Sequence, residues 1–353
     1  MPVGSSMENS VELRPRAVLV TGGAGYIGSH TAYALSCEGY NVIIIDDFSQ
    51  QQTVLLPFAT VVAGDFADQQ ILNQIFTAYD IEAVFHFAAF IEVGESVKRP
   101  RLFYENNVAK TGTLLGVMLD HGVRRFIFSS SCAVYGEPQY LPMDEKHPTA
   151  PVSPYGKTKL AVEFILQDYA QAYGLEYAAL RYFNAAGALW ELGLGEQHTP
   201  ETHLIPRVLD AIAAGEEIQV FGDAYATADG TCLRDYIHVQ DLAQVHIRAF
   251  KYLQNKQESL VLNVGTGQGH TVREVIKAAE QVCRRSALVR VVAPRAGDAP
   301  VLVANTMRMR EVLNWQPQHS DLIAIIRSAQ AWQRVRRHGS IHFASQNTHH
   351  DRG

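Results

Sequence analysis

The sequence contains little cysteine, and no spacing that would organise the few it has. Its 353 residues include four cysteines, Cys37, Cys132, Cys232 and Cys283, and none of them forms a Cys-x-x-Cys pair. This pattern argues against a disulfide-stapled secreted domain and against a cysteine-rich metal site. We therefore expect free thiols, as in a reducing cytoplasm, and no metal site.

The sequence also lacks an excess of positive charge and any long apolar run. Lysine and arginine total 30 against 36 acidic residues, which gives a formal net charge of -6. Such a chain has no bulk attraction for polyanions, so we expect no nucleic-acid partner. No run approaches the length of a membrane-spanning helix, so we expect no membrane partner and a cytoplasmic location. The polar ends, 1–15 and 338–353, are expected to be a disordered leader and a polar tail.

A glycine-rich turn near the start is the first functional motif. Residues 17–20 are an apolar run typical of a buried strand, and TGGAGYIG follows at 21–28. Gly22, Gly25 and Gly28 let the backbone turn tightly and approach a pyrophosphate at the start of the next helix. The spacing therefore predicts a dinucleotide site.

An acidic residue after the second apolar run favours one dinucleotide. Residues 41–45 read as a strand that ends at Asp46, where a carboxylate can accept hydrogen bonds from the ribose hydroxyls of the adenosine. The same charge would repel a 2'-phosphate. We therefore expect NAD rather than NADP, whereas Asp47 alone would fit a solvated turn equally well.

Strand-like and helix-like segments alternate through the first half of the chain. The expected strands include 60–63, 83–87, 125–128 and 177–181, and the expected helices include 68–79, 102–121 and 155–173. Such alternation predicts an α/β fold with a Rossmann-type doubly wound parallel sheet. The expected division is a NAD-binding domain at 16–186, to which the chain returns around 235–265, and a smaller α/β substrate-binding domain at 187–337.

Three polar residues predict the chemistry. Tyr155 and Lys159 stand four residues apart on an expected helix, so they project from one face. A neighbouring ammonium favours the phenolate and lowers the pKa of the tyrosine toward the range in which it acts as a base. Ser131 follows a strand at the carboxyl edge of the sheet, where ligands bind in this architecture. Together these residues predict a redox site.

The motifs resemble those of the extended short-chain dehydrogenase/reductase family, and within it the UDP-glucose 4-epimerases. The similar segments are TGGAGYIGSH (21–30), VFHFAA (84–89), VGES (93–96), NNV (106–108), FSSSCAVYG (128–136), SPYGKTK (153–159), RYFNAAGA (181–188), DGTCLRDYIHVQDLA (229–243) and RAGDAPVLVA (295–304). Sugar-nucleotide 4,6-dehydratases are also similar, but they carry an Asp-Glu pair where this sequence has Cys132 and Ala133. Elimination of water is therefore disfavoured.

The resemblance implies NAD-dependent interconversion of UDP-galactose and UDP-glucose. Tyr155 would remove the proton of the sugar 4-hydroxyl while hydride passes to NAD, and Ser131 would hydrogen-bond the same oxygen. Lys159 and the nicotinamide charge would lower the pKa of Tyr155. The 4-keto sugar would then rotate and receive hydride on its opposite face. A homodimer formed through the regions 102–121 and 155–173 is also implied.

The resemblance also implies two sets of binding residues. The cofactor set is Gly22, Gly25, Tyr26, Ile27, Gly28, Asp46, Asp47, Phe48, Ser49, Asp65, Phe66, Phe87, Ala88, Ala89, Asn106, Tyr155, Lys159 and Phe183. The substrate set is Ser131, Tyr155, Asn184, His203, Leu204, Phe221, Arg234, Arg295, Asp298 and Leu302. In the second set, Arg234 and Arg295 would hold the diphosphate and Asp298 the uridine ribose.

Several positions depart from the family pattern. Ile91 replaces a lysine that reaches the cofactor phosphates, so NAD should be held less tightly. Gln50 and Gln51 replace small polar residues, and His203 stands where some members have a substrate-binding asparagine. Leu302 stands where a tyrosine crowds the acetamido group of N-acetylated sugars. We therefore expect a preference for UDP-glucose and UDP-galactose, with weak activity on acetamido sugars.

Two alternatives remain open. One is a 4-epimerase of another UDP-sugar, such as UDP-GlcNAc, UDP-glucuronate or a UDP-pentose, and only substrate profiling separates these enzymes. The other is a non-catalytic NAD sensor. The intact set of Ser131, Tyr155 and Lys159 argues against a sensor, because a sensor needs no proton relay.

Overall fold

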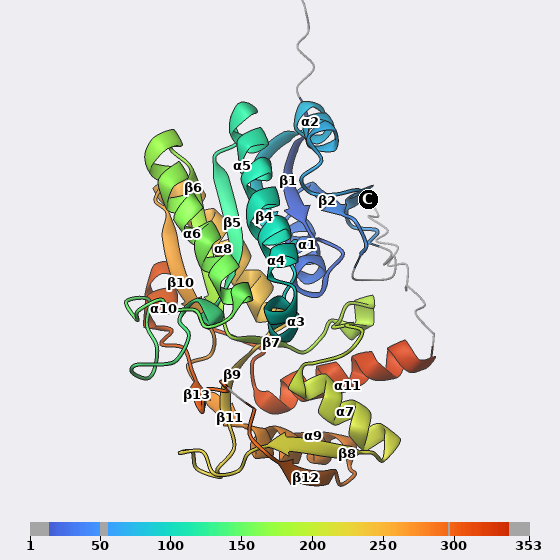
Figure 1. The fold of residues 1–353 in the computed structure, drawn as a ribbon. Coiled ribbons are helices and arrows are strands. Elements are labelled where there is room, and N and C mark those ends of the chain that lie inside the picture. Colours follow the sequence, from blue (N-terminus) through green and yellow to red (C-terminus); the bar gives the residue numbers. More distant parts are fainter. Residues whose placement is uncertain (1–13, 50–55, 296, 339–353) are drawn as a thin grey trace, which may run out of the picture.

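A seven-stranded parallel sheet organises the larger part of the molecule in the computed structural model, which describes residues 14–49, 56–295 and 297–338 (Figure 1). The strand order is β10-β6-β5-β4-β1-β2-β3. Its strands are β1 (Arg16–Thr21), β2 (Val42–Asp46), β3 (Thr60–Ala63), β4 (Asp80–His86), β5 (Arg125–Ser131), β6 (Glu176–Tyr182) and β10 (Leu260–Val264). This arrangement confirms the expected Rossmann-type α/β fold.

Helices cover both faces of this sheet. They are α1 (Tyr26–Cys37), α2 (Gln69–Ala78), α5 (Lys110–Asp120), α6 (Pro154–Tyr173) and α8 (Val239–Lys256). In β1, Val18 and Val20 pack into the apolar cluster that includes α1 and α8, while Ala17 and Leu19 pack into the cluster of α2, α5 and α6. Side chains alternate along a strand, so a strand between two helical layers must be apolar on both faces.

Local sequence sets the ends of α6. The Ser153 hydroxyl accepts a hydrogen bond from the Gly156 amide at 3.1 Å, and Pro154 occupies the first turn, where its missing N–H costs nothing. At the other end Gly174 adopts φ 68°, the left-handed conformation that glycine tolerates best. The helix therefore starts immediately before Tyr155.

A buried ion pair fastens α6 to the sheet. Glu163 on α6 receives two charged hydrogen bonds from Arg181 on β6, with Nη2 to Oε2 at 2.5 Å and Nε to Oε1 at 3.0 Å. The Ser130 hydroxyl on β5 also donates to Glu163, at 2.5 Å. The side chains of Glu163 and Arg181 are only 1% and 7% exposed, so removal of either partner would leave an unpaired buried charge. Such a loss typically costs about 3–5 kcal/mol.

The expected helix at 102–121 is wrong in one respect, because it is not continuous. The chain forms α4 (Pro100–Tyr104), a π-helical turn (Glu105–Ala109) and then α5. Within the wide turn, the Asn107 side chain accepts a hydrogen bond from the Phe90 amide and donates to the Phe90 carbonyl and the Thr158 hydroxyl. These contacts with distant segments accompany the local departure from α-helix.

The second half of the chain builds a smaller α/β part, below the large sheet in Figure 1. Its helices α7 (Leu204–Ala214), α9 (Val272–Cys283) and α11 (Leu322–His338) share one apolar cluster with β8 (Glu217–Phe221). β8 pairs with β12 (Leu288–Val292), while β9 (Leu233–His238) pairs with β7 (Asn184–Ala186), β11 (Gly269–Thr271) and β13 (Val301–Leu302). The remaining elements are α3 (Val93–Lys98), α10 (Met307–Leu313) and single 3-10 turns at Cys132–Val134 and Trp190–Leu192. The domain boundaries stay a prediction.

Some expectations fall largely or wholly outside the described residues. These are the leader at 1–15, the polar tail at 338–353, and the departures at Gln50 and Gln51. Within the described ranges, no helix combines the length and the apolar character that crossing a membrane requires.

Candidate active site

The glycine turn between β1 and α1 is closed so tightly that side chains cannot enter it. Gly22 has φ +68°, and a Cβ atom there would lie 2.6 Å from the Ala88 amide nitrogen. A Cβ atom on Gly28 would lie 2.2 Å from the Gly22 carbonyl oxygen. Gly25, as the N-cap of α1, offers no capping side chain, so the first amides of the helix point toward an anion site. The turn has the shape that a pyrophosphate requires.

Asp46 lies directly beside this turn. Its Oδ2 atom accepts a hydrogen bond from the Ala24 amide and its Oδ1 atom accepts one from the Phe48 amide, both at 2.9 Å. Burial raises the pKa of the Asp46 carboxyl, and the two amide hydrogen bonds act against this rise. Each carboxylate oxygen has a further lone pair, so the group can also accept hydrogen bonds from ribose hydroxyls.

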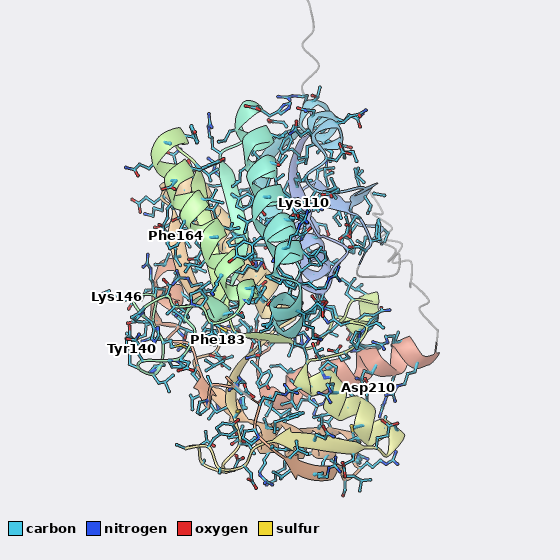
Figure 2. All side chains as sticks on the ribbon, viewed as in Figure 1. Lys110, Tyr140, Lys146, Phe164, Phe183 and Asp210 are labelled. Carbon is cyan, nitrogen blue, oxygen red and sulfur yellow. The ribbon has the colours of Figure 1, made fainter. Side chains whose placement is uncertain are left out.

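The loop after β3 is ordered by a second acidic residue. The Asp65 carboxylate accepts a hydrogen bond from the Ala67 amide at 2.9 Å and forms an ion pair with the Lys110 ammonium at 2.5 Å. The Lys110 ammonium also lies 5.8 Å from the centre of the Phe66 ring, and Figure 2 labels Lys110 on α5. Because β3 is the neighbour of β2, these residues lie beside the edge that carries Asp46.

Most other members of the expected cofactor set follow the carboxyl ends of the parallel strands. Asp47, Phe48 and Ser49 follow β2, Phe87, Ala88 and Ala89 follow β4, Phe183 follows β6, Tyr26 and Ile27 begin α1, and Asn106 lies in the π-helical turn. The hydroxyl of Tyr26 donates to the Gly187 carbonyl at 2.7 Å, so it links the cofactor turn to the start of the smaller part. The structure therefore gathers this set at one edge of the sheet.

The three expected catalytic residues lie close to one another at the same edge. Ser131 ends β5, and Tyr155 and Lys159 occupy the first two turns of α6. All three are buried. The Lys159 amine donates to the Ser129 carbonyl at 2.7 Å and lies 5.8 Å from the centre of the Tyr155 ring.

The expectation that Lys159 and the nicotinamide charge together lower the pKa of Tyr155 stays a prediction, and the residues of the chain alone act in the opposite direction. Burial raises the pKa of Tyr155 well above its usual value, the neighbouring Tyr182 adds to the rise, and a hydrogen bond with Ser131 opposes it. Burial also lowers the pKa of Lys159 to about 7. A lysine that is only partly protonated near neutral pH cannot supply a full positive charge to Tyr155. Burial is the largest cause of the pKa shift of both residues.

Four of the expected substrate-binding residues contact one another in two pairs, one an ion pair and one a stacked arginine and phenylalanine. Arg234 on β9 makes an ion pair with Asp298, with Nη2 to Oδ1 at 2.7 Å. The guanidinium of Arg295 stacks on Phe221 at the end of β8, with its carbon 3.8 Å from the ring centre. A diphosphate bound by either arginine would therefore meet a side chain that is already oriented.

Asn184, Leu204 and Leu302 take different positions. Asn184 on β7 donates a hydrogen bond to the Asp235 carbonyl at 2.9 Å. Leu204 is the first residue of α7. Leu302 packs against the small apolar cluster that contains Phe183, the residue labelled near the centre of Figure 2. Leu302, which is expected to govern the choice of sugar, thus packs against the cluster that contains Phe183, which is expected to contact the cofactor.

His203 belongs to a group that the sequence analysis did not foresee. Its Nδ1 atom lies 2.5 Å from Glu196 Oε1 and 3.3 Å from Glu201 Oε1, and His198 Nδ1 lies 3.2 Å from the same Glu196 atom. Burial opposes a charge on His203, but its contacts with the two glutamates outweigh this effect and raise its pKa to about 10. The signal in the sequence is the spacing Glu-x-His-x-x-Glu-x-His at 196–203. The expectation of no metal site therefore has to be reconsidered.

Comparisons with known proteins agree with this geometry. The model of the NAD dependent epimerase/dehydratase family matches residues 18–265. The chain belongs to this family. A UDP-glucose 4-epimerase of Rhizobium meliloti (strain 1021) is 48% identical over 323 residues, which cover 91% of this chain and 98% of the relative. These matches confirm the resemblance inferred from the motifs.

Solved structures of epimerases share the fold. The UDP-glucose 4-epimerase from Brucella ovis in complex with NAD is 46% identical, with a TM-score of 0.86 and coverage of 90% of this chain and 97% of that one. The enzyme from Bifidobacterium longum in complex with NAD+ and UDP is 38% identical, with a TM-score of 0.85 and coverage of 92% and 100%.

The residues of this family member fit NAD. The glycine turn leaves room for backbone contact with phosphate, and Asp46 places a carboxylate where a 2'-phosphate would be repelled. When bound, NAD supplies a hydride acceptor and a positively charged ring. That charge is of the kind needed to offset the high pKa of Tyr155, which Lys159 does not offset by itself.

Replacing Lys159 by methionine should change how stability depends on pH. The pKa of Lys159 is about 7 in the fold against 10.5 in its ordinary state, so between these values the unfolded chain binds more protons than the folded chain. The contribution of Lys159 to the free energy of unfolding therefore rises with pH across this window. The free energy of unfolding is measured with denaturant on nucleotide-free protein. The value for the wild type minus the value for Lys159→Met should rise by up to about 1.4 kcal/mol per pH unit.

The exposed neighbour Lys157 provides the control, since Lys157→Met should leave the slope unchanged. A difference for Lys159→Met that stays flat with pH would mean that Lys159 keeps its proton in the folded protein.

Proposed function

We propose that this protein is a UDP-glucose 4-epimerase, an enzyme that interconverts UDP-galactose and UDP-glucose with NAD. The observation that carries the proposal is the grouping of Ser131, Tyr155 and Lys159 at the sheet edge that also bears the glycine turn. Relatives at 48% and 49% identity that carry this enzyme name support it.

The roles of the three residues follow from their positions. Tyr155, in its phenolate form, takes the proton of the sugar 4-hydroxyl, and the phenol that results later returns the proton to the same oxygen. Ser131, at the end of β5, hydrogen-bonds the same sugar oxygen and helps to relay the proton. Burial of the trio keeps bulk water away from the reacting oxygen, which protects the 4-keto sugar from competing reactions.

The nucleotide end of the substrate is held by residues far along the chain. Arg234 and Arg295 bind the diphosphate, Asp298 binds the uridine ribose, and Leu204 and Phe221 line the nucleotide pocket. In this proposal Asn184 contacts the diphosphate and the sugar. Firm contacts at the nucleotide leave the sugar ring free to turn over between the two hydride transfers.

Cys132 and Ala133 occupy the two positions at which dehydratases carry an acid and a base. Burial raises the pKa of the Cys132 thiol to about 12, and Ala133 carries no ionisable group. A thiol with such a pKa stays protonated and is a poor proton acceptor at neutral pH. An epimerisation, which needs only one proton-transfer centre, fits these residues better than a dehydration.

Conversion of UDP-galactose, followed by proton NMR with no added NAD, is the deciding experiment. Wild-type protein should form UDP-glucose with its retained cofactor, and Tyr155→Phe should reduce kcat by roughly 10²- to 10⁴-fold because the proton-transfer group is lost. NAD binding by the variant should remain, which separates the chemistry from the fold.

Three other results are possible, and two of them would contradict part of the proposal. Full turnover by Tyr155→Phe would contradict the mechanism. Wild-type activity that requires added NAD would keep the function and show that Ile91 weakens cofactor retention. No conversion even with NAD would favour the glucuronate, pentose or sensor alternatives.

Leu302 should set the tolerance for acetamido sugars. We expect wild-type kcat/KM to be higher for UDP-galactose than for UDP-GlcNAc, and Leu302→Ala to narrow the gap by opening space for the acetamido group. Leu302→Tyr is the matched opposite change and should widen it. Steady-state assays with both sugars measure this, and equal efficiencies for wild type would contradict the role of Leu302.

We also propose a homodimer, formed through the regions 102–121 and 155–173, in a cytoplasmic enzyme with free cysteines. Phe164 on α6, labelled in Figure 2, is 53% exposed in the single chain, and an exposed large apolar side chain on this helix suits an interface with a second copy. Phe164→Glu should yield a 39.1 kDa monomer by light scattering. Leu288→Glu, at an exposed apolar position on β12, should stay dimeric, and a wild-type monomer would contradict this proposal.

A further inference from the structure

Four side chains with metal-binding atoms converge in the loop that leads into α7. They are Glu196, His198, Glu201 and His203, and one ligand atom from each lies within 4.8 Å of the others. Individual separations run from 2.5 Å, between Glu196 Oε1 and His203 Nδ1, to 4.0 Å, between His198 Nδ1 and Glu201 Oε2. All four come from eight consecutive residues, so a single loop builds the group.

The donor set matches a divalent transition metal. Imidazole nitrogen and carboxylate oxygen bind Zn²⁺ at about 2.0–2.2 Å, which places tetrahedral ligands roughly 3.3–3.5 Å apart. The observed separations bracket this distance. Two carboxylates also balance the charge of a divalent ion when both histidines are neutral.

Two atoms of the group make no hydrogen bond among the described residues. They are His198 Nδ1 and Glu201 Oε2, which are buried from solvent, although His198 Nδ1 lies 3.2 Å from Glu196 Oε1. A buried polar atom without a hydrogen bond is unfavourable by about 1–3 kcal/mol, and these two atoms lie 4.0 Å from each other. A bound cation would satisfy them together.

The backbone and outer contacts hold the ligands in place. Glu201 Oε1 accepts hydrogen bonds from the amides of Thr202 and His203, both at 2.8 Å. The carbonyl of Glu196 accepts one from the Trp332 indole on α11, also at 2.8 Å. Such outer contacts orient ligands in metal sites.

We propose that Glu196, His198, Glu201 and His203 form a binding site for a divalent transition-metal ion, with Zn²⁺ as the best match. Because the protein supplies four ligands, the role is structural, and the ion fixes the loop that precedes α7. The site shares His203 with the expected substrate set, but none of its residues belongs to the Ser131, Tyr155 and Lys159 trio, so Zn²⁺ binding can be measured apart from turnover. The competing arrangement is a proton shared between His203 and the glutamates.

Metal binding by full-length, untagged protein tests the site. After treatment with a chelator, the wild type should take up one Zn²⁺ per chain by calorimetry and elemental analysis, and its Tm should rise by a few degrees in saturating Zn²⁺. His198→Gln and Glu201→Gln should each lose most of this uptake and the Tm rise. Co²⁺ should give a visible absorption band in the wild type that both variants lack.

A control guards against histidines elsewhere in the chain. His349→Gln combined with His350→Gln should keep the full Zn²⁺ uptake, because this pair lies outside the loop. Circular dichroism shows whether each variant is folded. If His198→Gln does not fold, Glu201→Gln takes its place as the test of Zn²⁺ uptake. Failure of the wild type to bind Zn²⁺, or equal uptake by folded wild type and His198→Gln, would overturn the proposal and favour the shared proton.

Discussion

The desolvated carboxylate of Glu163 holds together the parts on which the site depends. It joins α6, which carries Tyr155 and Lys159, to β6 through Arg181 and to β5 through the Ser130 hydroxyl. Ser131 follows directly along β5, so the position of the serine relative to the tyrosine is set by the same interaction. The charge of Glu163 also opposes the burial-driven fall in the pKa of Lys159. One buried anion thus affects both the geometry and the electrostatics of the trio.

The electrostatics of this trio are completed by a ligand rather than by the chain. Burial favours the neutral forms of both Tyr155 and Lys159. A tyrosine of this kind is a weak base until a positive charge is brought near it. In the proposed mechanism, proton transfer would therefore be coupled to the oxidised cofactor, because the nicotinamide ring would supply both the hydride acceptor and the charge that favours the phenolate.

Local patterns predicted the parts of the structure that local forces determine. β3 (Thr60–Ala63) was predicted with the right bounds, and α6 with an error of one residue at its start, since Ser153, Pro154 and Gly174 supply its caps. Contacts between distant segments were not predictable in this way. The π-helical turn depends on Asn107 reaching Phe90, and the pairing of Arg234 with Asp298 joins residues 64 positions apart. The raised pKa of Tyr155 arises from tertiary burial, which no spacing reveals.

The pairing of Arg234 with Asp298 gives the proposed nucleotide pocket an internal counter-ion. Before a nucleotide arrives, the guanidinium presents no uncompensated charge, so inorganic phosphate and other small anions gain little by approaching it. A nucleotide gains more, because its diphosphate can engage the arginine while its ribose hydroxyls donate to the released carboxylate. Recognition then requires the ligand to replace both partners of the ion pair, with its diphosphate on Arg234 and its ribose on Asp298. Anions that lack the ribose replace only one partner and would bind less well.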